Sequence, residues 1–145
     1  IQLGAWVAGY LSHANRVTAG TYDIMPIQNI YGVATILARI CDSNPQSLIE
    51  PAMDGIVSVM RDYTQPTDSP LSVVENEGKE IAVRQAVLRD AQRLLIAQGY
   101  LAAGNDDGAY GPKTRDALSE FQQSKKLEAN GLPDALTLFV LFDSK

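Results

Sequence analysis

The segment Asp107-Gly108-Ala109-Tyr110-Gly111-Pro112-Lys113-Thr114 decides the fold of the last third of the chain. Asp107 can accept backbone N–H bonds across a tight turn. Gly108 and Gly111 allow backbone conformations with positive φ. Pro112 suits the first turn of a helix, because its missing N–H would have no partner there. The segment therefore predicts a tight loop that leads directly into a helix.

The sequence on both sides of this loop predicts two more helices. A helical spacing of apolar residues begins at about Val83 and ends at Gln98, and Gly99 follows as a C-terminal cap. Asn130-Gly131 is a second turn signal, after which Pro133 is expected to open the last helix. The middle helix has an apolar side made of Thr114, Ala117, Leu118 and Phe121. Three short helices are thus predicted around the loop.

The order and spacing of these residues resemble the three-helix peptidoglycan-binding domain found on many bacterial wall hydrolases. The resemblance covers about residues 84–142 and runs through Gln92, Gly99-Tyr100, the loop from Asp107 to Thr114, Phe121-Gln122, Leu127, Gly131 and Thr137. It implies that this part of the chain binds a glycan strand or a stem peptide of peptidoglycan.

Six residues are the expected contacts to that ligand: Asp107, Gly108, Tyr110, Gly111, Gln122 and Asn130. The first two and Gly111 also suit a purely structural role in the turn. A tyrosine can present an apolar face and a hydroxyl to a sugar, so Tyr110 could contact ligand, although packing is the more frequent role. For Gln122 and Asn130 the alternative to a ligand contact is simple exposure to solvent.

Three further helices are predicted in residues 1–62. Apolar positions spaced by three and four mark one helical face over residues 1–16. Pro26 suits the first turn of a second helix. Ser47 and Glu50, three residues apart, predict a capping box at the start of a third helix. Alternatively, Pro51 places the start of this helix nearer Glu50, because a proline suits the first turn.

The junction between the two helical regions, residues 63–80, is either a linker or a hairpin. Leu71–Glu75 and Glu80–Val83 flank a polar four-residue turn, which is typical of a hairpin. Alternatively, the second arm begins the next helix. The predicted fold is mostly α, with two small three-helix units in residues 1–62 and 81–145. No internal repeat is evident.

Residues 3–60 resemble the HdeA/HdeB-like group of small helical periplasmic proteins. The resemblance rests on the segments Trp6-Val7-Ala8-Gly9-Tyr10-Leu11-Ser12, Tyr22-Asp23-Ile24 and Ile40-Cys41-Asp42-Ser43-Asn44-Pro45. In that group this cysteine pairs with one before the first helix, which implies that Cys41 is a disulfide candidate. Its partner is absent from this chain. The chain also starts at Ile1 with a residue that suits a helix interior, so we expect that residues are missing before it. A buried free thiol is the alternative for Cys41.

The charge and the chemistry-bearing residues disfavour several function classes. Residues 1–77 contain three basic and eight acidic residues, and residues 78–145 contain nine of each. No basic face for nucleic acid is therefore expected. No apolar run reaches the roughly 18–20 residues that span a bilayer. The single histidine, His13, and the single cysteine have no spacing that predicts a catalytic pair, a metal site or a cofactor.

The predicted function is non-catalytic binding of the bacterial cell wall by a periplasmic or secreted protein. One alternative is a periplasmic stress chaperone that the second unit tethers to the wall. Another is an interaction or inhibitor protein for a partner enzyme, with residues 1–60 as the surface that binds the protein partner. A wall hydrolase is disfavoured because no nucleophile–base pair is evident.

Overall fold

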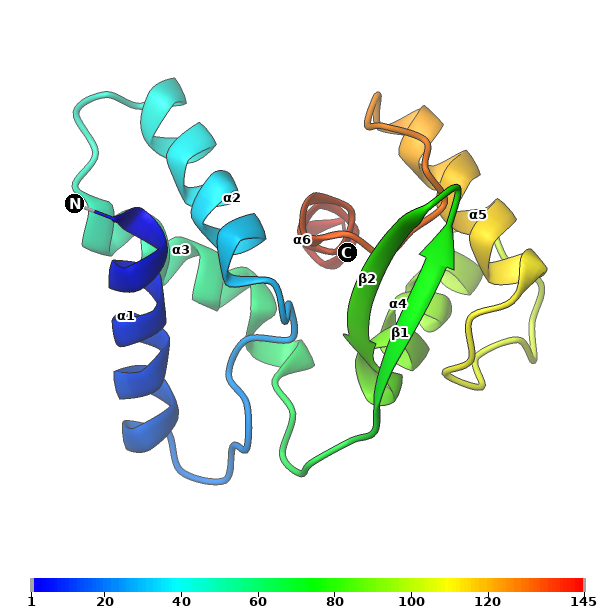
Figure 1. Ribbon diagram of the computed structural model, residues 1–145, viewed down its shortest axis with the longest axis horizontal. Helices are drawn as coiled ribbons and strands as arrows, with labels where there is room; N and C mark the ends of the chain where they lie inside the picture. The colour runs from blue at the N-terminus through cyan, green and yellow to red at the C-terminus, as the bar shows by residue number, and fades with distance from the viewer. Residues whose placement is uncertain (1, 145) are drawn as a thin grey trace. The chain divides into compact units, whose positions relative to one another are not determined.

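The structure is a computed structural model that describes residues 2–144. The chain forms two compact units, Ile1–Asp68 and Ser69–Lys145. Within the described range there are six α-helices, a 3-10 turn and one antiparallel hairpin (Figure 1). The prediction of a mostly α fold with a hairpin between its helices is confirmed. No helix in this range is long and apolar enough to cross a lipid bilayer.

The first unit contains three helices: α1 (Leu3–Val17), α2 (Ile30–Ser43) and α3 (Ile49–Met60), with a 3-10 turn at Arg61–Tyr63. Helix α2 packs against both α1 and α3. The buried residues of the three helices are apolar, and they include Val7, Leu11, Val33, Ile36, Leu37, Met53, Ile56 and Met60. Backbone hydrogen bonds between Asp23 and Gln65 join the loop after α1 to the segment after α3. The unit therefore closes around one small core.

One predicted helix start and one predicted helix cap in this unit are wrong, whereas α3 does begin near Glu50, at Ile49. Pro26 is buried in the loop, and α2 begins at Ile30, where the side chain of Asn29 accepts the N–H of Gly32 at 3.2 Å. This asparagine cap is a stronger start than a proline alone. The predicted capping box at Ser47 does not form either. Leu48 occupies the N-cap position of α3 without a side-chain hydrogen bond.

The second unit begins with a two-stranded hairpin, β1 (Leu71–Asn76) and β2 (Lys79–Arg84). The register pairs Leu71 with Arg84 and Asn76 with Lys79, and Glu77-Gly78 forms the turn with φ of 52° and 77°. Positive φ at both turn residues matches the twist of the strands. The second arm is therefore a strand, and the expected junction 63–80 is divided between the two units.

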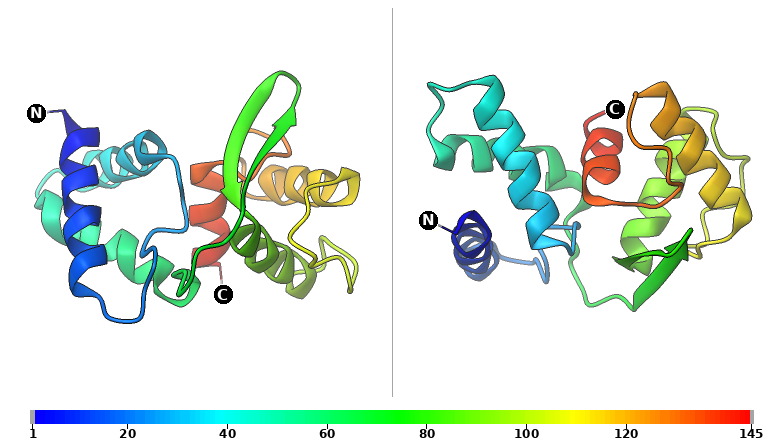
Figure 2. Two further views of the ribbon diagram at one scale, coloured as in Figure 1. Left: turned by 60° about the horizontal axis from the view of Figure 1, so that its bottom comes forward. Right: turned by 45° about the horizontal axis from the view of Figure 1, so that its top comes forward.

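Three helices complete the second unit: α4 (Gln85–Ala97), α5 (Pro112–Ser124) and α6 (Ala135–Asp143). Both α5 and α6 pack against α4 (Figure 2). The shared core contains Val87, Leu88, Ala91, Leu95, Ala117, Leu118, Phe121, Leu138 and Leu141. These helices place the two loops that follow α4 and α5 on one scaffold.

The helix boundaries of the second unit agree with the sequence except at α6. Gly99, with φ of 83°, ends α4 while the N–H of Tyr100 bonds to the carbonyl of Leu95 at 2.9 Å, as in a Schellman motif. Pro133 does not open the last helix. The side chain of Asp134 accepts the N–H of Thr137 at 2.9 Å, so α6 starts after this aspartate cap.

Candidate functional site

A buried glutamine on α4 organises the loop that precedes α5. The residue is 0% exposed, and its amide lies near four groups of the loop. Oε1 of Gln92 accepts the N–H of Gly108 at 2.8 Å. Nε2 donates to the carbonyl of Ala109 and to Oγ1 of Thr114, both at 2.9 Å, and lies 3.3 Å from Oδ1 of Asp107. Because the buried amide of Gln92 bonds to several groups of the loop at once, it restrains the conformation of the loop.

Asp107 and Gly108 form the tight turn of this loop. Oδ1 of Asp107 accepts the N–H of Ala109 at 2.8 Å, and this bond is the main reason that the pKa of Asp107 is lowered. Gly108 has φ of 75°, and a Cβ there would lie 2.7 Å from the carbonyl oxygen of Gln85. Only glycine fits this position. Gly108 is also buried, so its role is in the backbone of the turn.

A second buried glutamine holds the loop before α6 in the same way. Gln122 on α5 is also 0% exposed, and its Oε1 accepts the N–H of Gly131 at 2.8 Å. Its Nε2 donates to Oδ1 of Asn130 and Oγ1 of Thr137 at 2.9 Å, and to the carbonyl of Leu132 at 3.0 Å. Each helix that precedes a loop therefore supplies one glutamine to fix it.

The two loops form a structural repeat that the sequence did not reveal. Asn130 stands where the first loop has Asp107, since its Oδ1 accepts the N–H two residues later at 2.8 Å. A glycine with positive φ follows each of them. Thr114 and Thr137 both lie in the first turn of a helix and both accept from a glutamine. The Asp/Asn, Gly and Thr pairs are each 23 residues apart, whereas the two glutamines are 30 residues apart, so the spacing is constant only within the loops.

Tyr110 joins the two loops. Its hydroxyl donates to the carbonyl oxygen of Gly131 at 2.8 Å, and burial raises the pKa of Tyr110. The residue as a whole is half-buried. The hydroxyl hydrogen is therefore used inside the protein, while part of the side chain stays at the surface.

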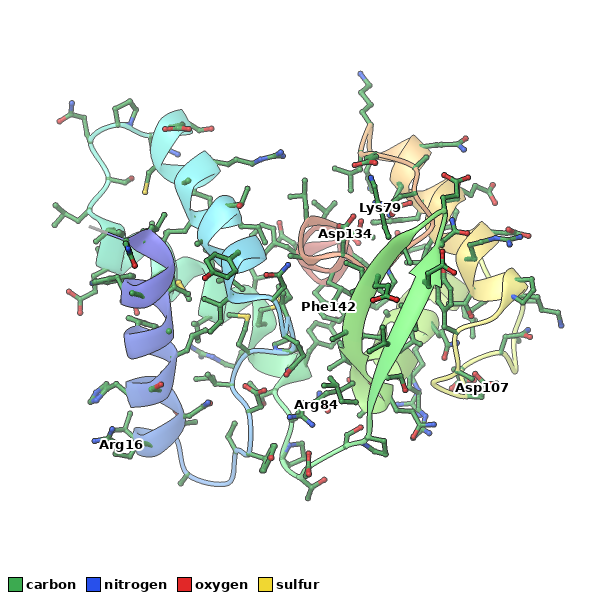
Figure 3. All side chains as sticks on the ribbon, viewed as in Figure 1. Arg16, Lys79, Arg84, Asp107, Asp134 and Phe142 are labelled. Atoms are coloured by element: carbon green, nitrogen blue, oxygen red, sulfur yellow. The ribbon has the colours of Figure 1, made fainter. Side chains whose placement is uncertain are left out.

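The first loop borders an open depression of about 370 Å³. It is lined by Asn105, Asp107, Ala109, Tyr110, Gly111, Pro112, Lys113 and Thr114. Figure 3 shows Asp107 on the loop that leads into α5. At the rim, Nζ of Lys113 donates to Oδ1 of Asn105 at 3.2 Å. The depression thus offers an ammonium, a carboxylate, an amide and part of an aromatic ring to a ligand.

The hairpin is tied to the second loop. Nδ2 of Asn76 donates to the carbonyl of Asn130 at 2.8 Å, and Lys79 forms an exposed ion pair with Glu128. Lys79 lies at the hairpin tip, near Asp134 (Figure 3). A small polar pocket of about 190 Å³ lies between the hairpin tip, α5 and this loop. The hairpin is therefore a fixed part of this surface.

The six predicted site residues separate into surface and supporting groups. Gln122 and Gly108 are buried with their polar groups bonded inside the protein, so the alternative that Gln122 is exposed to solvent is wrong. Asp107, Tyr110 and Gly111 line the depression. Asn130 lines the small polar pocket instead.

Sequence reasoning did not assign a site role to Asn105, Lys113 or Gln92. The first two lie on the rim of the depression, and the third holds its loop from below. Lys113 lies within the segment from Asp107 to Thr114, and its place in this segment was the available signal. For Gln92 the signal was its place in the resemblance, although its buried position required the structure.

The remaining chemistry-bearing residues lie elsewhere. Cys41 is a free, half-buried thiol on α2, and His13 is exposed on α1. Between residues 2 and 144, no group of three or more His, Cys, Asp or Glu side chains is arranged to hold a metal ion.

Residues 84–141 match the protein family described as "Putative peptidoglycan binding domain". The match begins at the end of β2 and includes α4, α5 and nearly all of α6, so it contains both glutamine-held loops. Comparison with curated proteins and with solved structures returned no match. The matched region supports peptidoglycan binding in general.

Proposed function

We propose that the second unit binds peptidoglycan at the depression beside the first loop, and that the chain is a non-catalytic binding protein of the bacterial periplasm or exterior. The observation that carries the proposal is that the matched residues 84–141 build an open surface from Asp107, Tyr110 and Lys113. The other residues of the loops serve to hold that surface.

The chemistry of the depression fits the groups that peptidoglycan offers, which are amides, hydroxyls and scattered carboxylates. The ammonium of Lys113 can pair with a stem-peptide carboxylate. The exposed carboxylate of Asp107, which lines the depression, can accept from a hydroxyl or an amide. The exposed part of Tyr110 can pack against a sugar ring.

Binding at such a site is weak. The depression is open, and few charged groups meet the ligand. A shallow site with few polar anchors corresponds to a Kd of about 0.1–1 mM, or roughly −4 to −6 kcal/mol. The wall presents many identical sites, so weak binding is sufficient to retain a protein there.

The absence of catalysis and the location belong to the same proposal. The resemblance of the first unit to HdeA/HdeB-like periplasmic proteins supports the location, and the lack of a nucleophile–base pair at Cys41 and His13 supports the absence of catalysis. Residues 1–60 are the proposed surface for a protein partner. No nucleic acid is proposed as a ligand, since the second unit carries nine basic and eleven acidic residues and therefore no excess of positive charge.

Sedimentation with purified, insoluble peptidoglycan tests the proposal. We expect the whole chain to move to the pellet at high sacculus concentration, and Lys113→Gln and Tyr110→Ala to weaken that binding. Gln123→Ala is the matched control, because Gln123 is an exposed residue of α5 that does not line the depression. Failure of the unmodified chain to sediment refutes peptidoglycan binding. Equal sedimentation of all variants leaves binding intact but refutes this surface.

A further inference from the structure

The first unit contains a groove that wall binding by the second unit does not use. Helix α2 packs against both α1 and α3, and an open cavity of about 630 Å³ lies between α1 and the stretch from α3 to Thr64. This volume lies within the range of sites that bind small ligands. Its apolar surface comes from Ala14, Val17, Ile24 and Val57. The groove is therefore large enough for a ligand and has an apolar base.

Charged groups of opposite sign lie along one wall of the groove. Glu50, Asp54, Val57 and Arg61 follow one another at intervals of three and four residues, so they share one face of α3 and its 3-10 extension. The two carboxylates lie toward the start of α3. The guanidinium of Arg61 lies beyond its end.

These charges are available to a ligand. The hydroxyl of Tyr10 donates to Oδ1 of Asp54, and within residues 2–144 the second carboxylate oxygen of Asp54 forms no hydrogen bond. Burial and this bond raise the pKa of Tyr10 to about 12, so the tyrosine remains a neutral donor at ordinary pH. Within residues 2–144, the side chains of Glu50 and Arg61 form no hydrogen bond or ion pair. An acidic end and a basic end thus remain unneutralised.

We infer that this groove binds a short peptide with a free amino group and a free carboxylate. The amino group lies at Glu50 and Asp54, the carboxylate lies at Arg61, and apolar side chains of the peptide cover the base of the groove. Seven residues of helix separate Asp54 from Arg61, or about 10 Å along the axis. An extended tripeptide spans about the same length.

Other ligand classes fit the groove less well. An uncharged apolar ligand would cover the two carboxylates and the guanidinium without supplying partners, and burial of unpaired charge is unfavourable. A simple anion would bind at Arg61 but leave the acidic end and the apolar base empty. A short zwitterionic peptide satisfies all three parts of the groove. This inference is independent of wall binding.

Titration of the whole ¹⁵N-labelled chain with the tripeptide Val-Ala-Val tests the inference by NMR. We expect shifts in the amide signals of Ala14, Val17 and Val57. Acetylation of the peptide's amino end, or amidation of its carboxyl end, should each weaken binding about tenfold, because each removes one charge-assisted contact.

Variants assign each end of the peptide. Asp54→Asn combined with Glu50→Gln should remove the preference for the free amino end, and Arg61→Gln should remove the preference for the free carboxylate. Arg39→Gln is the control, since Arg39 is exposed on α2 and does not line the groove. The inference is overturned if the three peptides bind equally, if the shifts fall outside the groove, or if no shift occurs at the highest peptide concentration.

Discussion

Nε2 of Gln92 donates to Oγ1 of Thr114 at 2.9 Å, and both side chains are buried. The bond joins the middle of α4 to the first turn of α5, across the loop that borders the candidate site. A buried amide without these partners would be desolvated without a compensating hydrogen bond, which is unfavourable. The pair therefore sets the shape of the ligand-facing loop, although neither residue needs to contact the ligand.

Gln92→Ala should destabilise the second unit by about 2–4 kcal/mol. The substitution leaves the N–H of Gly108 and the carbonyl of Ala109 without their buried partner and creates a cavity. Urea unfolding followed by NMR signals of the second unit measures this change, because the two units need not unfold together.

Gln123→Ala is the matched control for this prediction. Gln123 is exposed on α5, and its loss should change the unfolding free energy by less than about 0.5 kcal/mol. Gln122→Ala, in the second loop, should cost as much as Gln92→Ala since it loses the equivalent bonds. If Gln92→Ala or Gln122→Ala changed the unfolding free energy as little as Gln123→Ala, the repeat would not stabilise the second unit as argued.

Gly108→Ala should destabilise the second unit more than Gly99→Ala, by about 1 kcal/mol or more. Both glycines have positive φ, so both substitutions carry the strain of about 1–2 kcal/mol that this conformation imposes on other residues. Only Gly108 adds a clash, because a Cβ would lie 2.7 Å from the carbonyl oxygen of Gln85, whereas nothing lies within 4 Å at Gly99. Thermal unfolding of the two variants compares the costs. Equal melting temperatures would show that the loop moves to relieve the clash.

The loop from Asp107 to Thr114 could be predicted in part, because several of its residues have a local reason to adopt their conformation. Gly111 is the exception, since the sequence suggested a positive φ and the residue is extended with φ of −142°. The aspartate accepts from a backbone N–H two residues away, Gly108 has positive φ, and Pro112 is the first residue of α5. Such preferences act over a few residues and are written in the residue types themselves. The C-terminal cap at Gly99 was predictable for the same reason.

The supporting contacts could not be predicted, because they depend on distant residues. The residue type of Gln122 does not reveal whether its side chain is buried or exposed. Only the packing of α5 on α4 places its amide under the second loop. The start of α2 shows the limit for local signals. Pro26 and Asn29 can both begin a helix, and the asparagine side chain provides the hydrogen bond that decides between them.

Tyr110→Phe should destabilise the second unit by about 1 kcal/mol, the value of one hydrogen bond, while the ring is kept. The lost bond is the one from the hydroxyl to the carbonyl of Gly131, which joins the two loops. Burial raises the pKa of Tyr110 in the folded protein. The contribution of its protonated hydroxyl to stability is therefore fully present below the usual tyrosine pKa of about 10, and it is lost as the pH rises through the raised value. The stability difference between the two proteins should therefore shrink at alkaline pH in urea titrations. A difference that stays constant up to strongly alkaline pH would contradict this assignment.

Asp107→Asn should reduce the loss of stability that the second unit shows in acid. The N–H of Ala109, which bonds to the carboxylate, is the main cause of the lowered pKa of Asp107 in the folded protein. A carboxyl group with a lowered folded pKa contributes stability that is fully present above its unfolded value, near 3.8, and that disappears as the pH falls through the folded value. An asparagine at this position can accept the same bond through Oδ1, as Asn130 does in the second loop, and it does not titrate. The unfolding free energies of the two proteins should thus differ above the unfolded pKa of the carboxyl group and converge as the pH falls through the lowered pKa of folded Asp107. A gap that stays constant over this range would show that the ionised form of Asp107 is not what stabilises the loop.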